Sequence, residues 1–251
     1  MASPRSKLEQ YLELAREVCS LAKGIVDRAS SRLGDDARAL RFRSRVLTGL
    51  AVKMYNCFES LIEDAARERL EAMHHLKTLV ETFIYFHWVG QDAGEKRARL
   101  VYARTVDGTI RFYKKNRVQA SQELHHQLQE MLPSAIEGLG PEWENFKGRS
   151  IEQLARDVGV ELQEWYDRVY RSACGPAHMG DLVEYMPTSE GTVRLGETST
   201  SALRAQIALD YGLLIMLDLL KVASDSLELG LEQKIEAIRT RHNDSRVLRL
   251  E

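Results

Sequence analysis

The residues best suited to chemistry lie between positions 166 and 181, where a polar cluster interrupts an apolar helical pattern. Tyr170, Cys174 and His178 recur every four residues, so a continuous helix would align them on one side. Arg171 and His178 would then lie about 20° apart around the helix axis. The spacing therefore offers a cation and a proton-transfer group on one face.

Two features of this segment keep a simpler interpretation open. Gly175-Pro176 is as compatible with a kink or a new helix start as with a continuous helix. Asp167 and Arg171 are also one helical turn apart, so they could pair on the surface while His178 acts as a local cap or a core partner.

A second candidate is the stretch 111–117, which combines four cations with two aromatic rings. That composition suits phosphate contact and base stacking, and the contact residues would be Arg111, Lys114, Lys115 and Arg117. Tyr113 also fits the apolar period of this helix. The pattern therefore favours a solvated helix face whose Lys and Arg stems cover the edge of the core.

Two Glu-x-x-His pairs, Glu71 with His74 and Glu123 with His126, have the spacing of metal ligands in di-iron helical bundles. Glu71 and His74 lie away from the apolar stripe of their helix, so we expect them to face solvent, and we predict no metal site and no cofactor. His87 does fall within that stripe, which is typical of a core histidine bonded to one partner. Lys77 and Glu81 border the stripe and could form a salt bridge.

Composition excludes several classes of function. The 35 Lys and Arg nearly balance the 37 Asp and Glu, so any site for a polyanion must be a local patch. The three cysteines are far apart and indicate reduced thiols. No apolar signal core follows the N-terminus, and the longest apolar run, 211–217, is too short to span a membrane. We therefore expect a cytoplasmic protein.

Apolar residues recur at steps of three and four along most of the chain, which predicts an all-α bundle of six or more helices. The helical patterns cover 8–29, 40–65, a stretch ending at Gly90, one or two helices before Pro133, 150–174, 203–229 and 231–241. The boundary between the second and third helices cannot be placed. Segment 138–148 is expected to be a loop, and 188–200 an irregular loop or small hairpin.

The pattern favours a single helical domain over residues 1–251. Long N-terminal helices would occupy 1–90, middle helices with the polar motif 91–187, and a loop with C-terminal helices 188–251.

Two segments resemble a bacterial helical family of unknown function, whose members carry Arg-x-x-x-Glu and Tyr-x-x-x-Ser-x-x-x-His helices. Here the matching residues are Lys77 with Glu81, and Tyr170 with Cys174 and His178. Lys replaces the Arg and Cys replaces the Ser. The chain is more distantly similar to HEPN-like domains, whose ribonuclease members use an Arg followed by four to six residues and a His. Arg171 and His178 satisfy that spacing, although Ser172 stands where an Asn commonly follows the Arg.

Two hypotheses about function follow. The first is a helical module that binds a protein or nucleic-acid partner, with homodimerisation through helix faces as one arrangement. The alternative, which the HEPN resemblance implies, is a metal-independent endoribonuclease that uses Arg171 and His178, with Glu81 or Tyr170 nearby. In that case His178 would move the proton of a ribose 2′-hydroxyl and Arg171 would stabilise charge on the phosphorane.

Overall fold

The computed structural model describes residues 4–35, 42–116, 122–177, 199–227 and 229–245. Across these residues the backbone forms helices joined by turns, and no strand is present in them, which confirms the predicted all-α class. Residues 188–198 of the expected loop or hairpin lie outside this part of the chain, and Ser199 and Thr200 instead open a helix. The three cysteines are free thiols, as expected.

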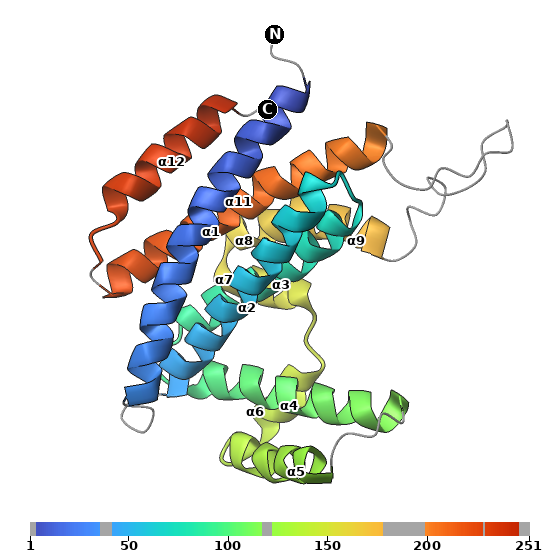
Figure 1. The fold of residues 1–251 in the computed structure, drawn as a ribbon. Coiled ribbons are helices and arrows are strands. Elements are labelled where there is room, and N and C mark those ends of the chain that lie inside the picture. Colours follow the sequence, from blue (N-terminus) through green and yellow to red (C-terminus); the bar gives the residue numbers. More distant parts are fainter. Residues whose placement is uncertain (1–3, 36–41, 117–121, 178–198, 228, 246–251) are drawn as a thin grey trace, which may run out of the picture.

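Four long helices form the centre of the bundle: α1 (Pro4–Asp35), α2 (Phe42–Ala66), α3 (Glu71–Gly90) and α11 (Ser199–Leu227). The helix α12 (Glu232–Ser245) packs against α1 and α11 on one side (Figure 1). Each central helix contributes an apolar stripe to a shared core, whose largest fully buried side chains include Phe58, Leu76 and Met216. The three-to-four residue period of the sequence thus produces the core directly.

The boundary between α2 and α3 falls at residues 67–70. Glu68 adopts a left-handed backbone conformation with φ of 52°, which reverses the chain without glycine or proline. The Asp64 carboxylate fixes the turn, because it lies 3.5 Å from the Arg69 guanidinium and 3.1 Å from Nε2 of His75. No Gly or Pro marks this turn, so its position cannot be predicted from residue types.

The helices α4 (Lys96–Asn116) and α5 (Gln122–Ile136) form a hairpin at one end of the bundle (Figure 1). Val106, Ile110 and Leu128 make a small core between them that is separate from the main one. The prediction that a helix ends before Pro133 is wrong, because α5 continues to Ile136. Pro133 is exposed and only three residues follow it, so the lost backbone hydrogen bond lies in the last turn.

A short helix, α6 (Pro141–Lys147), occupies the segment expected to be a loop at 138–148. Pro141 starts it, and Trp143 and Phe146 lie three residues apart and are both buried. The ring of Phe146 stacks on Trp88 of α3 with a centroid separation of 5.0 Å. Tertiary packing of two aromatic rings therefore forms a helix that is too short to show a period.

The polar segment belongs to a chain of short helices: α7 (Ile151–Val158), α8 (Val160–Trp165), the π-helical turn η1 (Tyr166–Tyr170) and α9 (Arg171–Ala177). Ser150 and Gln153 form a capping box at the start of α7, and Gly159, with φ of 145°, separates α7 from α8. The helical backbone continues through Gly175-Pro176 to Ala177, which decides the question that the sequence left open. Among the described helices, none is long and apolar enough to cross a membrane.

Candidate functional site

Two tyrosine rings and two cations form a row between α3 and η1. Tyr166 and Tyr170 stack with a centroid distance of 5.1 Å and an interplanar angle of 21°. The Arg171 guanidinium carbon lies 5.4 Å from the Tyr166 ring, and the Lys77 ammonium lies 6.0 Å from the Tyr170 ring. We call these four residues the tyrosine stack. Its order is cation, ring, ring, cation, and both rings are half-buried with part of their surface open to solvent.

The π-helical turn is what brings the rings together. A π-helix makes hydrogen bonds five residues apart, so its turn is wider than that of an α-helix and residues four apart lie more nearly above one another. The turn lies between α8 and α9, and Val169 anchors it in the core. Lys77 comes from a different helix, α3, which packs against both η1 and α9.

Arg171 forms the exposed end of the tyrosine stack. Its Nε lies 3.3 Å from the Asp167 carboxylate one turn earlier, which confirms the surface pairing expected from the sequence. A second carboxylate, Glu152 of α7, lies 3.8 Å from its Nη2. The Arg171 side chain is 58% exposed, so water screens both pairs and each contributes at most about 1 kcal/mol.

Glu81 lies one turn after Lys77 on α3 and is half-buried. Lys77 and Glu81 do not form the expected salt bridge in the described structure, because Lys77 lies over Tyr170 instead. Burial, the charge of Glu81 and the side chain of Cys174 raise the pKa of Tyr170. The Tyr170 hydroxyl therefore stays protonated at neutral pH and can donate a hydrogen bond to a ligand.

The predicted catalytic residues are brought together only in part. Glu81 and Tyr170 are close enough for the charge of one to raise the pKa of the other. Arg171 lies at the far end of the stack, beside Tyr166, and makes no ion pair with Glu81 in the described part of the chain. His178 lies outside the described residues, so its role stays a prediction.

The predicted nucleic-acid contacts lie at the end of α4. Arg111, Lys114 and Lys115 are exposed, and Arg117 lies outside the described residues. Arg111 pairs with Asp107 at 2.8 Å. Tyr113 packs against the small core between α4 and α5, as its place in the apolar period indicated.

Three of the four candidate metal ligands are on the surface, and the side chain of the fourth, Glu123, lies outside the described residues. Glu71 and His74 are both exposed, which confirms that they face solvent. His126 is exposed and lies 3.3 Å from Glu130 of its own helix. His87 is half-buried and bonded to one carboxylate, with Nε2 2.9 Å from Oδ2 of Asp218 on α11. Among the residues that the structure describes, no group of three His, Cys, Asp or Glu could hold a metal ion.

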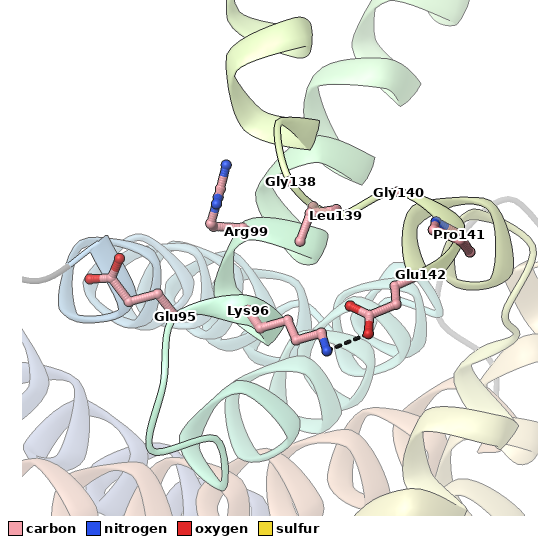
Figure 2. Close-up of a pocket in the computed structure, with 8 residues that line it drawn as sticks. All are labelled: Glu95, Lys96, Arg99, Gly138, Leu139, Gly140, Pro141 and Glu142. Carbon is pink, nitrogen blue, oxygen red and sulfur yellow. Dashed lines mark ion pairs between the residues drawn. The ribbon is translucent and has the colours of Figure 1, made fainter.

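Sequence reasoning missed an open cavity of about 620 Å³ between the start of α4 and the loop before α6. Figure 2 shows Lys96 and Glu142 pointing toward one another across it, where they form an ion pair. Arg99 donates hydrogen bonds to the carbonyl oxygens of Ser134 and Glu137 at the end of α5. These charged groups already bond to other parts of the protein. The contacts of Lys96 and Arg99 around the cavity therefore hold α4, α5 and α6 together.

The model of one protein family matches residues 44–192, which is more than half of the chain. The chain belongs to DUF5677, a family of unknown function. The DUF5677 match runs from near the start of α2 beyond the end of α9, and it therefore includes the whole tyrosine stack. It confirms the expected membership of a family of unknown function, while the two motifs and the HEPN-like relationship stay predictions. No curated protein and no solved structure is significantly similar to the chain.

Proposed function

We propose that the protein binds single-stranded RNA through the tyrosine stack. The observation that carries this proposal is the alternation of cation, ring, ring and cation in Lys77, Tyr170, Tyr166 and Arg171. Proteins that bind single strands stack bases on aromatic rings and meet the backbone phosphates with Lys and Arg. The half-exposed rings supply the first kind of contact and the flanking cations the second.

The charges around the stack are compatible with this proposal. Lys77 makes no ion pair with a carboxylate in the described structure, so its ammonium can contact a phosphate. Arg171 would give up its contacts with Asp167 and Glu152 for a contact with a phosphate, and both of these ion pairs are exposed and weak. Because the net charge is −2, binding depends on this local arrangement rather than on a general attraction.

RNA is a better ligand than DNA because polar groups border the Tyr170 ring. The protonated Tyr170 hydroxyl would exchange its hydrogen bond to the Cys174 side chain for one to the ligand, and the Glu81 carboxylate can accept a hydrogen bond. A ribose 2′-hydroxyl is both a donor and an acceptor, and it is the group by which proteins distinguish RNA from DNA. We therefore expect an oligouridine to bind more tightly than the deoxy oligomer of the same length.

Fluorescence anisotropy of a labelled oligouridine tests the proposal. Replacing Tyr166 with Leu keeps apolar volume but removes the stacking face, so affinity should fall at least about fivefold, the equivalent of 1 kcal/mol. The Arg171→Ala substitution should lower the affinity by a similar factor. Arg168→Ala is the matched control, because Arg168 is an exposed cation on the same turn that lies over no described ring. The proposal fails if wild type does not bind, or if Arg168→Ala weakens binding as much as Arg171→Ala.

A second candidate function is metal-independent cleavage of the bound RNA, favoured by the presence of Arg171 in the stack and of Glu81 beside Tyr170. In this reaction His178 takes the proton of a ribose 2′-hydroxyl, and the 2′-oxygen forms a bond to the adjacent phosphorus. The bond from phosphorus to the 5′-oxygen breaks, and that oxygen leaves with a proton from water. Arg171 offsets the negative charge that develops on the phosphate oxygens.

Cleavage is tested separately from binding, with labelled RNA in the presence of EDTA. We expect wild type to produce a 2′,3′-cyclic phosphate and a 5′-hydroxyl, and His178→Ala to be inactive but to bind RNA as before. His74→Ala is the control, since His74 is exposed on α3. Intact RNA with wild type, or full activity in His178→Ala, would exclude this second function and leave the binding proposal in place.

A further inference from the structure

The hairpin of α4 and α5 carries a groove that the proposed function does not use. It has a volume of about 380 Å³ and lies where the two helices face each other. Its floor consists of aliphatic side chains and a proline ring: Ile110, Leu132, Pro133 and Ile136. Leu132 and Ile136 are only partly buried and Pro133 is exposed, so apolar surface remains open to solvent.

The rim of this groove is mainly basic. Arg111 and Lys114, one turn apart on α4, line it, and both are exposed. Asp107 lines it as well and pairs with Arg111 at 2.8 Å. Lys114 and its neighbour Lys115 make no ion pair with any residue that the structure describes. The rim therefore carries positive charge that its own carboxylate does not balance.

Pro133 also alters the backbone of α5 beside this groove. Pro133 has no N–H, so it cannot donate the α-helical hydrogen bond to the carbonyl of Gln129 one turn earlier. Gln129 and Pro133 both line the groove.

We propose that this groove binds an acidic amphipathic helix of a partner protein. Leu or Met side chains on one face of such a helix would bury the aliphatic floor, and its Asp or Glu residues would meet Lys114 and Arg111. The groove favours a protein over a nucleic acid, because none of the described residues that line it has an aromatic ring for a base to stack on. This site is independent of the tyrosine stack, whose rings and cations lie on α3, η1 and α9.

The probe is a fluorescein-labelled peptide of fifteen residues, the length of α5, with Leu at steps of three and four and Glu elsewhere. We expect this peptide to bind wild type and the Lys114→Glu variant to weaken binding at least about fivefold, because an attractive contact becomes repulsive. The same peptide with Lys in place of every Glu should not bind wild type, but should bind Lys114→Glu more tightly than the Glu peptide does. Lys234→Glu on α12 is the matched control, because Lys234 is an exposed cation on a helix that packs mainly against α1 and α11.

Three results would overturn the proposal. Equal binding of the Glu and Lys peptides, or of Lys114→Glu and wild type, would remove the charge argument. Displacement of the Glu peptide by oligouridine that does not depend on Tyr166 would assign the groove to RNA. A dimer in analytical ultracentrifugation that Lys114→Glu dissociates would make a second copy of this chain the occupant. Circular dichroism of each variant establishes that it is folded.

Discussion

In the part of the chain that the structure describes, two histidine–aspartate pairs involve α11, and they differ in burial. His87 of α3 lies 2.9 Å from Asp218, with side chains 27% and 37% exposed. His242 of α12 lies 2.7 Å from Asp210, with side chains 0% and 6% exposed. The residue types are the same, but water screens only the first pair, and only the first pair has the geometry of a hydrogen bond. Exposure, rather than distance, should therefore decide how much each pair matters to stability.

The largest effect should come from breaking the buried pair. Asp210→Ala leaves the fully buried His242 ring without its carboxylate, and we expect a loss of about 1–3 kcal/mol in the free energy of unfolding, the cost of an unsatisfied buried polar group. Urea denaturation followed by circular dichroism measures this loss. Because α12 packs on α1 and α11, part of the loss should appear as local opening of α12 in hydrogen exchange.

The same substitution eight residues later should have a much smaller effect. Asp218→Ala removes the carboxylate from the half-exposed His87, whose ring can then bond to water. We expect a loss of no more than about 1 kcal/mol, measured in the same urea experiment. If Asp218→Ala destabilises the protein as much as Asp210→Ala does, burial does not explain the difference between the two pairs.

The smallest effect concerns Asp92, a carboxylate held by backbone donors rather than by histidine. It accepts hydrogen bonds from the backbone N–H groups of Gly94 at 2.9 Å and Arg97 at 2.8 Å, before and within the first turn of α4. Burial raises the pKa of Asp92. These hydrogen bonds and the charges of Arg97 and Arg43 together lower it by more, so the net pKa is below the usual value. The stabilisation from Asp92 is present above the unfolded pKa of about 3.9 and is lost as the pH falls through the folded pKa.

Asp92→Asn tests this pH dependence. The variant should be less stable than wild type at about pH 7, and the difference between the two should shrink toward about pH 2. Denaturation curves at several pH values measure it. A difference that stays constant over this range would show that the charge of Asp92 contributes nothing.

The sequence predicted the long helices because their period is repeated many times. The apolar stripes of α1, α3 and α11 run over many turns, whereas α6 has only seven residues and depends on the contact between Phe146 and Trp88. The turn at Glu68 was not placed, because its left-handed conformation is held by tertiary contacts rather than by a residue type.

The candidate site was predictable only in its residue types. The spacing of Tyr166 and Tyr170 is visible in the sequence, but the π-helical turn that stacks them is not. The approach of Lys77 to Tyr170 joins residues on different helices, so it depends on the packing of α3 against η1. The pairing of Arg171 with Asp167 joins residues only four apart in the sequence, and this prediction is confirmed.

Photocrosslinking tests whether RNA binds at the tyrosine stack, because it reports which residues lie next to the RNA. Oligouridine containing 4-thiouridine is irradiated with the protein, and the crosslinked peptides are identified by mass spectrometry. We expect the main crosslinks on Tyr166 and Tyr170, and we expect their yield to decrease in the Arg171→Ala variant. Crosslinks confined to the end of α4, around Lys114 and Lys115, with none at the tyrosine stack, would contradict this expectation.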